Sequence, residues 1–361
     1  MSAPDPGTTA QQLEALRQQI DAIDDQVLQL VNQRASIARR IGEIKGDGPV
    51  YRPEREAQVL RRMQAANPGP LPNDAIARVY VEVISACRAI EAPISVAFLG
   101  PRGTFSEEAA IKRFGSSAKG VPCTSIDEVF RQVEAHEAAF GVVPVENSTE
   151  GAVGRTLDLL LATPALITGE VLLPVHQCLM SKADDARAIQ RVYAHGQSLG
   201  QCHQWLNQNL PAAQRVQMVS NAEAARRAAE EAGGAAIGSQ AAAALYDLKL
   251  LARNIEDNPN NTTRFAVIGH LVVPPSGRDK TSLVMSTRNR PGAMHDLLEP
   301  LAEQGVSMTR LESRPSRTGM WEYVFFVDLE GHQRDANVAV ALEELRRRAS
   351  FLKILGSYPA A

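Results

Sequence analysis

The chain has 361 residues, of which 44% are hydrophobic and 22% are charged. This composition is that of a folded globular protein, and the length favours two or three domains over one. Lys and Arg total 38 against 41 Asp and Glu. The near balance, without a block of basic residues, argues against a nucleic-acid partner.

Neither the start of the chain nor its cysteines indicate export. The first residues contain no basic segment followed by an apolar one, and no run of 18 apolar residues occurs later. We therefore expect a cytoplasmic protein without a membrane segment. No Cys-x-x-Cys pair occurs, so we expect reduced, mostly buried thiols and no zinc site at the four cysteines: Cys87, Cys123, Cys178 and Cys202.

Three regions with different patterns follow one another. Residues 13–91 carry only helical signals, residues 94–269 alternate strand-like and helical stretches, and residues 280–358 form a compact mixed pattern. Breaks fall at Ala92-Pro93 and in the proline-rich stretch 273–277. We therefore expect domains over residues 1–92, 93–272 and 273–361.

The first region begins with an apolar seam that contains cations. Arg34 occupies one seam position, and Lys45 lies three helical turns later, roughly 20° away around the axis, so both can face one pocket. Arg17 lies about 100° off that line, where it would serve a pocket in a partner chain. A helix over 13–45 would be about 50 Å long, more than this domain can cover alone. The apolar seam positions are Leu16, Ile20, Ile23, Val27, Leu30, Ile37, Ile41 and Ile44.

Two further helices are predicted in this region. One begins after Pro53 and carries Arg55 and Glu56 near its start. The other runs from about Asn73 to Glu91, with an inner face of Ile76, Val79, Tyr80, Val83, Ile84, Cys87 and Ile90.

Taken singly, the charges of the first region are compatible with solvated helix ends or intersubunit ion pairs. Taken together they favour an anionic ligand, because burying several cations with few acids costs several kcal/mol each unless an anion binds.

Residues 13–91 resemble the all-helical chorismate mutase domain, which forms an intertwined homodimer. The resemblance implies that Arg34 and Arg55, with Arg17 of the other subunit, hold the two carboxylates of chorismate. It also implies that Glu56 accepts a hydrogen bond from the ring hydroxyl and that Lys45 faces the ether oxygen. Rearrangement to prephenate is unimolecular, so the site needs only to compact the substrate and stabilise the charge growing on that oxygen.

Three positions depart from the best-known pattern of this family. Arg52 stands where some members carry Asp, and Cys87 and Glu91 stand where some carry Ser and Gln. We place Arg52 and Cys87 in the binding site and Glu91 beside Lys45 in catalysis. A glutamate facing the ether oxygen helps only as a protonated donor, so we predict that mutase activity favours mildly acidic pH. A dehydratase with a decayed mutase stays open as an alternative.

The middle region begins with a predicted strand over 94–100 and a capping box formed by Thr104 and Glu107. The loop between them lacks the third glycine of GxGxxG and the ending of a P-loop, which excludes ATP and NAD sites. A second strand, 140–145, ends in the polar turn 146–151, which lines a ligand crevice or is a plain turn.

Further alternation indicates a second, parallel lobe. Strands are predicted over 192–195, 216–219 and 235–238, with one helix over 197–210. Ser220 and Ser239 are predicted to cap the helices after the last two strands.

Residues 94–270 resemble prephenate dehydratase, a two-lobed fold similar to periplasmic ligand-binding proteins. The resemblance rests on Gly-Pro-Arg-Gly-Thr-Phe-Ser at 100–106, Val-Pro-Val-Glu-Asn-Ser at 143–148 and Thr-Arg-Phe at 263–265. It implies that Thr263 hydrogen-bonds the departing ring hydroxyl as carbon dioxide leaves and phenylpyruvate forms. A threonine hydroxyl is a poor acid, so it must work in a dry network or through water. Expected prephenate-binding residues are Thr104, Ser106, Asn147, Ser148, Thr149 and Arg264; the role of His195 stays open.

Residues 280–358 follow the order strand 281–287, helix 292–304, strand 306–312, strand 321–329, helix 337–348 and strand 351–355. This ferredoxin-like order resembles the ACT domain. The resemblance implies end-product inhibition by phenylalanine bound between the ACT domains of two subunits. The matching motifs are Gly292-Ala293-Met294 and Glu312-Ser313-Arg314-Pro315.

Together the three resemblances predict a multidomain, bifunctional enzyme of phenylalanine biosynthesis. It combines an all-α intertwined domain, an α/β two-lobed domain and an α+β ferredoxin-like domain, without metal or cofactor. Its predicted partners are chorismate, prephenate, phenylalanine as effector and a second copy of the chain; pairing of dimers into tetramers stays open. A non-catalytic amino-acid sensor is a rival, but it does not explain Arg34 and Lys45 in an apolar seam.

Overall fold

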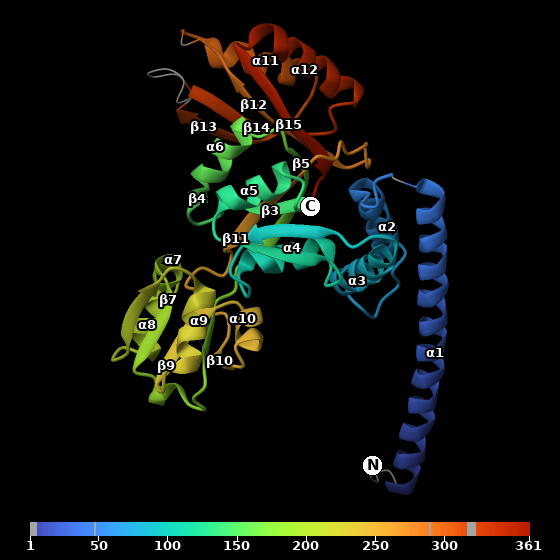
Figure 1. The fold of residues 1–361 in the computed structure, drawn as a ribbon, viewed down its shortest axis with the longest axis vertical. Coiled ribbons are helices and arrows are strands. Elements are labelled where there is room, and N and C mark those ends of the chain that lie inside the picture. Colours follow the sequence, from blue (N-terminus) through green and yellow to red (C-terminus); the bar gives the residue numbers. More distant parts are fainter. Residues whose placement is uncertain (1–5, 47, 289, 316–322) are drawn as a thin grey trace, which may run out of the picture.

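The computed structural model describes residues 6–46, 48–288, 290–315 and 323–361. A helical part, a two-lobed α/β part and a sheet covered by two helices follow one another along the chain (Figure 1). The predicted fold class is confirmed.

The helical part consists of α1 (Pro6–Lys45), α2 (Pro53–Ala65) and α3 (Asn73–Glu91). Pro53 opens α2, where its missing N–H costs no hydrogen bond. Near its C-terminal end α1 packs against α3, where Gly42 lies against the side chain of Glu91. The rest of α1 stands clear of the chain (Figure 1).

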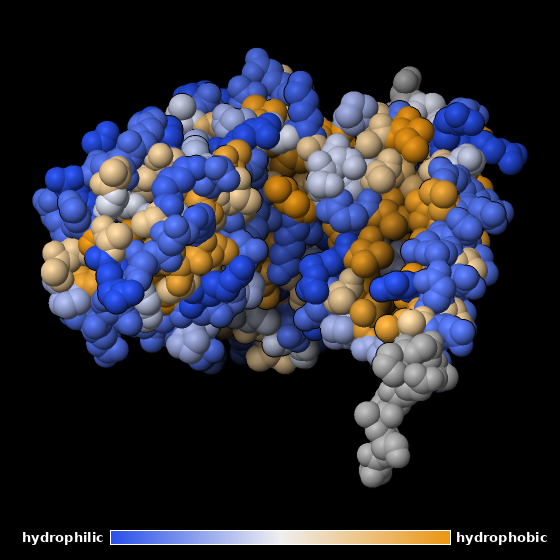
Figure 2. Space-filling model, turned by 90° about the horizontal axis from the view of Figure 1, so that it is seen from below, coloured by the Kyte–Doolittle hydropathy of each residue, from blue (hydrophilic) through white to orange (hydrophobic). Residues whose placement is uncertain are grey.

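The apolar seam of α1 is uncovered in a single chain. Leu16, Ile20 and Ile23 are 55%, 57% and 58% exposed. Val79 and Ile90 of α3, predicted on an inner face, are each 54% exposed, so that prediction is wrong for the chain alone. Figure 2, seen from below the view of Figure 1, shows apolar side chains gathered on the side of the molecule where α1 lies.

The first lobe contains a sheet in the order β2-β1-β3-β11-β5, with β4 beside β3. Strand β1 runs parallel to β2 and β3, whereas β11 is antiparallel to both β3 and β5. The predicted capping box forms at the start of α4, where Thr104 accepts from Glu107 N and Glu107 accepts from Gly103 N. The elements are β1 (Ser95–Leu99), α4 (Phe105–Phe114), β2 (Lys119–Cys123), α5 (Ile126–Glu134), β3 (Phe140–Asn147), β4 (Gly151–Ala152), α6 (Gly154–Ala162), β5 (Leu166–Pro174) and β11 (Thr262–Gly269).

The second lobe has a sheet in the order β10-β6-β9-β7-β8. It is mixed, which corrects the predicted parallel lobe: β7 is parallel to β8 and β9, but β6 is antiparallel to β9 and β10. The predicted helix 197–210 is two helices that meet at Cys202. Ser220 and Ser239 cap α9 and α10 as predicted. The elements are β6 (Cys178–Ser181), η1 (Ala186–Ala188), β7 (Arg191–His195), α7 (Gly196–Gln201), α8 (His203–Asn209), β8 (Gln214–Met218), α9 (Asn221–Glu230), β9 (Gly234–Gly238), α10 (Gln240–Leu245) and β10 (Lys249–Ala252).

The last part has an antiparallel sheet in the order β13-β14-β12-β15. The predicted element order is confirmed, although the second strand begins and ends later than predicted. The predicted start of the third strand, Trp321, lies outside the described residues. The elements are β12 (Asp279–Ser286), α11 (Ala293–Glu303), β13 (Met308–Pro315), β14 (Tyr323–Glu330), α12 (Ala336–Arg348) and β15 (Phe351–Pro359).

The first lobe holds the other parts together. One buried cluster joins Val143 and Leu157 of this lobe to Phe326 and Tyr358 of the last sheet. A second cluster brings Tyr51, from the segment between α1 and α2, into the lobe. The second lobe has two clusters of its own, separate from those of the first lobe.

Within the described ranges, no group of three or more His, Cys, Asp or Glu side chains is placed to hold a metal ion. The same part of the chain has no helix with the length and apolar character that crossing a bilayer requires. All four cysteines are free and buried, as predicted for the burial of these thiols.

Candidate active sites

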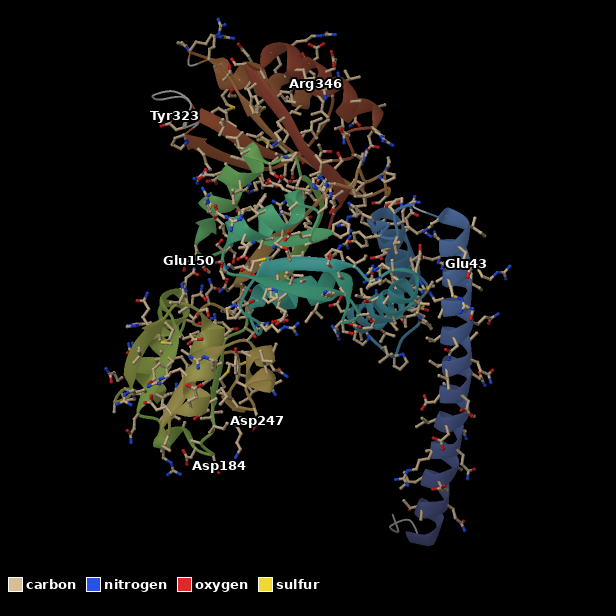
Figure 3. All side chains as sticks on the ribbon, viewed as in Figure 1. Glu43, Glu150, Asp184, Asp247, Tyr323 and Arg346 are labelled. Atoms are coloured by element: carbon tan, nitrogen blue, oxygen red, sulfur yellow. The ribbon has the colours of Figure 1, made fainter. Side chains whose placement is uncertain are left out.

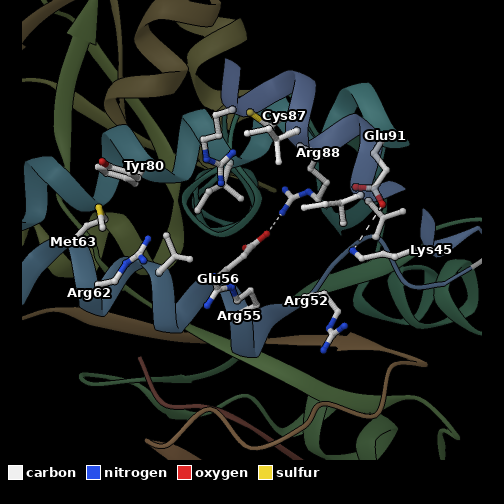
Figure 4. A pocket seen from close by; sticks show the side chains of 17 residues that line it. Lys45, Arg52, Arg55, Glu56, Arg62, Met63, Tyr80, Cys87, Arg88 and Glu91 are labelled. Carbon is white, nitrogen blue, oxygen red and sulfur yellow. Dashed lines mark hydrogen bonds and ion pairs between the residues drawn. The ribbon is translucent and has the colours of Figure 1, made fainter. Parts of the chain in front are cut away.

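A cavity of about 540 Å³ lies between α1, α2 and α3 in the helical part (Figure 4). Its walls combine apolar side chains with an excess of cations. The lining residues are Arg34, Ile37, Ala38, Ile41, Lys45, Val50, Arg52, Arg55, Glu56, Val59, Arg62, Met63, Tyr80, Ile84, Cys87, Arg88 and Glu91.

The helical period explains why distant residues meet here. Arg34 and Lys45, three turns apart on α1, both line the cavity, as their spacing predicts. Arg55 comes from the first turn of α2, and Cys87 and Glu91 come from successive turns of α3. Glu91 Oε1 lies 3.9 Å from Lys45 Nζ. The cavity therefore collects one ammonium and several guanidinium groups, which suits a ligand with more than one negative charge.

Arg17 is the member of the predicted set that the cavity does not include. It lies nearly five turns before Arg34, the first cavity residue on α1, and its side chain is 72% exposed and 3.9 Å from Glu14. This position is compatible with the prediction that Arg17 serves the cavity of a second chain.

Sequence reasoning missed Arg88. Its side chain is 7% exposed, and its Nη1 donates to Glu56 Oε1 inside the cavity (Figure 4). Its Nη2 donates to the backbone oxygen of Phe114 in the first lobe at 2.6 Å. The available signal was an arginine directly after Cys87 on the predicted inner face, but its partner on α4 is remote in sequence.

Glu56 is held in an environment that opposes its charge. Burial raises the pKa of Glu56, while the charges of Arg88, Arg113 and Arg34 act in the opposite direction. Cations from three separate helices therefore offset part of the effect of burial on this pKa.

A larger cavity, of about 960 Å³, lies in the cleft between the two lobes. Residues from both lobes line it, including Thr104, Ser106 and Asn147 from the first and Ser198 and Asn221 from the second. Glu150 also lines it and lies where the two lobes meet (Figure 3).

Thr263 is the centre of the polar wall of this cleft. It is 9% exposed, and on β11 it pairs with Asn147 at the end of β3. Asn147 Nδ2 donates to Thr263 Oγ1 at 2.8 Å and to Asn261 Oδ1 at 2.7 Å. Its Oδ1 accepts from Thr149 N, Thr149 Oγ1 and Glu150 N. The turn thus fixes the orientation of the Asn147 amide, and the amide orients the Thr263 hydroxyl.

Three residues predicted to bind prephenate do not line this cleft. Arg264 points to the opposite face of β11, because successive side chains of a strand alternate. There it bonds Glu170 at 2.8 Å and Tyr358 at 2.9 Å, and it pairs with Asp328. Ser148 bonds Asn260 O and Thr262 N, and Thr149 bonds Asn147, so both hold the turn.

Two further residues line the cleft. His195 lines the cleft and caps α7 by accepting from Gln197 N at 3.3 Å, so it has a structural role at the start of this helix. Gln177, not predicted, is 1% exposed and lines the cleft, with its Oε1 lacking a partner among the described residues. It follows the apolar strand β5, and no local pattern marks it.

The predicted phenylalanine motifs lie at the start of α11 and on the edge strand β13. Gly292 has a φ of 77° and begins the helix, while Ala293 behind it is buried. Glu312 and Ser313 lie on β13, whose outer edge has no neighbouring strand among the described residues. Arg314 instead reaches α6, where its Nη2 lies 3.1 Å from Asp158.

Comparison with known proteins decides the family. Models of three families match in order: chorismate mutase type II over residues 16–92, prephenate dehydratase over 96–271 and the ACT domain over 281–347. A bifunctional chorismate mutase/prephenate dehydratase of Neisseria gonorrhoeae is 53% identical over 348 residues, which is 96% of each chain. The chain belongs to this bifunctional family. The resemblances found in its motifs are thereby confirmed.

Solved structures resemble this family member over part of its length. A prephenate dehydratase of Arthrobacter aurescens in complex with L-Phe is 35% identical, with a TM-score of 0.69 over 74% of this chain and 90% of that one. GqqA, described as a quorum-quenching acylase, is 30% identical with the same TM-score, covering 74% and 98%. Because one fold can carry several reactions, the family assignment rests on the full-length relatives.

Proposed function

We propose that the helical cavity is the chorismate mutase site. Arg34 and Arg55 hold the two carboxylates, and Lys45 faces the ether oxygen, where negative charge grows as the carbon–oxygen bond breaks. Glu56 accepts from the ring hydroxyl, and Arg52 and Cys87 complete the wall. The observation that supports this most is the gathering of cations on apolar walls around 540 Å³, which suits a compacted dianion.

Glu91 is the second proposed donor to the ether oxygen. It lies across the cavity wall from Lys45, so both groups can reach the same atom of a bound substrate. To donate to that oxygen, it must carry a proton.

The cleft between the lobes is the proposed dehydratase site. When prephenate loses carbon dioxide, the electron pair of the broken carbon–carbon bond moves into the ring and expels the ring hydroxyl. A proton delivered to that oxygen makes water, and phenylpyruvate remains. Thr263 Oγ1, oriented by Asn147, is the proposed donor to the departing oxygen, with Thr104 and Ser106 holding the substrate.

Phenylalanine is the proposed inhibitor, bound at the last sheet by Gly292, Ala293 and Met294 with the strand of Glu312 and Ser313. The L-Phe complex of the Arthrobacter relative supports this ligand. Arg314 and Pro315 continue that strand, and the bond of Arg314 to Asp158 extends it toward α6. Such coupling between two sites amounts to about 1–3 kcal/mol.

The contacts of the last sheet favour a route to the dehydratase cleft. Arg310 of β13 bonds Glu146 at 2.7 Å, and Asp328 of β14 pairs with Arg264. Glu146 of β3 and Arg264 of β11 are register partners, next to the pair formed by Asn147 and Thr263. A shift of the last sheet would therefore act on the neighbours of both groups.

A homodimer is the proposed assembly. A second copy would cover the exposed seam of α1, and its Arg17 would reach the cavity of the first chain. We also propose that each chain has three domains, over residues 1–92, 93–272 and 273–361.

One coupled assay tests the whole assignment: conversion of chorismate to phenylpyruvate, measured with and without phenylalanine. We expect product formation that phenylalanine suppresses. Conversion of prephenate alone would indicate the alternative of a decayed mutase, and binding of phenylalanine without either conversion would indicate a sensor.

A further inference from the structure

The helical cavity is not closed by helices alone, because one of its walls is attached to the first lobe. Arg88 forms a bridge there: Nη1 donates to Glu56 in the cavity, and Nη2 donates to the backbone oxygen of Phe114 at 2.6 Å. Phe114 is the last residue of α4. Arg88 therefore joins the Glu56 carboxylate of the helical part to the backbone of the first lobe.

Aromatic packing holds this bridge in place. The Arg88 guanidinium lies over the ring of Tyr51, 5.2 Å from its centroid, and 5.9 Å from that of Phe114. Tyr51 in turn packs against Phe114 and Phe140 at centroid distances of 5.0 and 4.8 Å. Tyr51 and Phe114 are 2% and 1% exposed, so the guanidinium is fixed against a closed surface. A fixed donor in this setting holds its acceptor more strongly than a mobile one.

We propose that Arg88 is a positioning residue for chorismate rearrangement, and that the dehydratase part supports the mutase site through it. Arg88 favours the ionised form of Glu56 and holds its carboxylate in the orientation needed to accept from the substrate hydroxyl. This inference rests on the proposed placement of chorismate in the helical cavity.

The charged surroundings of Glu56 predict the sign of the effect. Arg34 reaches it from α1, Arg88 from α3 and Arg113 from α4, and their charges oppose the effect of burial on the pKa of Glu56. Without Arg88, Glu56 would take up a proton at higher pH and lose its accepting role. The other charged or titratable groups around the cavity are Lys45, Arg52, Arg55, Arg62, Tyr51, Tyr80, Cys87 and Glu91.

The experiment measures mutase rate against pH in the full chain carrying Arg88→Met. We expect kcat/KM to fall by about tenfold to a hundredfold, since small displacements of a positioned group cost this much. The acid limb of the profile should move to higher pH, and dehydratase activity on prephenate should stay within about twofold. Arg88→Lys should restore the acid limb in part, because it returns the charge without the two-pronged contact. The matched control is Arg78→Met, an exposed arginine on the same helix, with wild-type behaviour expected.

A second measurement covers misfolding, because removing one partner of a buried ion pair can destabilise the fold. If Arg88→Met does not fold, the Arg88→Lys profile decides. In a Glu56→Gln background, replacing Arg88 by Lys should cost less than about twofold, since the carboxylate it serves is gone. An unshifted acid limb in both Arg88 variants, or an undiminished cost in that background, would overturn the inference. Retained mutase activity in Lys45→Met would instead refute the placement of chorismate.

Discussion

The two cavities of this chain use opposite chemistry. The helical cavity is lined by an ammonium and several guanidinium groups on apolar walls, whereas Thr263 in the cleft is held by the neutral amide of Asn147. The first suits a reaction whose barrier falls when charge is stabilised, and the second suits one that needs a proton placed on a single oxygen. A charged site can be predicted from a sequence, because its cations interrupt an apolar pattern. A neutral site leaves no such interruption.

The largest effect is expected from Thr263→Ala. Removing the proposed donor should lower dehydratase activity by about 10²- to 10⁴-fold, the range that general acid catalysis supplies. Mutase activity should be unchanged, because the helical cavity is a separate site. Assays on prephenate and on chorismate with the same preparation measure both, and retained dehydratase activity would refute the assignment.

Lys45→Met should affect the mutase site and leave the dehydratase site intact. Loss of the ammonium facing the ether oxygen should lower mutase activity by about 10²- to 10³-fold, as removal of a charge-stabilising donor does elsewhere. Dehydratase activity on added prephenate should persist. If both activities fell equally with the fold intact, the two cavities could not be independent sites.

Asn147→Ala tests whether the cleft depends on orientation. It removes the donor to Thr263 and the acceptor for the 148–150 turn, so we expect dehydratase activity to fall by about tenfold to a hundredfold. Ser148→Ala is the matched comparison, because Ser148 holds the same turn without lining the cleft. Equal losses in the two variants would show that the turn, not the amide, matters.

Arg310→Met separates regulation from chemistry. Breaking the bond between Arg310 and Glu146 should raise the phenylalanine concentration needed for half inhibition by about fivefold or more, within the usual range of coupling between sites. The dehydratase rate without phenylalanine should change by a smaller factor than the phenylalanine concentration needed for half inhibition. A wild-type inhibition curve would exclude this contact as a route.

Glu91→Gln should change the shape of the mutase pH profile more than it changes the maximal mutase rate. If protonated Glu91 donates to the ether oxygen, wild-type mutase activity declines as the pH rises and the proton leaves. An amide donates at every pH, so the variant should lose that decline. A mutase profile identical to the wild type would count against this role.

Local sequence patterns are enough to predict some features of this chain. The bounds of α3 follow from its apolar period and its flanking prolines, and the meeting of Arg34 with Lys45 follows from three whole turns. Family resemblance put Arg264 beside its neighbour Thr263, although strand alternation already indicates that they face opposite ways. The bridge from Arg88 to Phe114 joins residues remote in sequence and depends on how two parts dock, which no local pattern contains.

Complementation between two variants tests most directly whether one chain carries two separate sites. Thr263→Ala alone should convert chorismate to prephenate and stop, and Lys45→Met alone should leave chorismate nearly untouched. Mixed after separate purification, they should form phenylpyruvate from chorismate, with prephenate diffusing from one to the other. The account would be contradicted if the mixture formed no phenylpyruvate and Thr263→Ala alone formed no prephenate from chorismate.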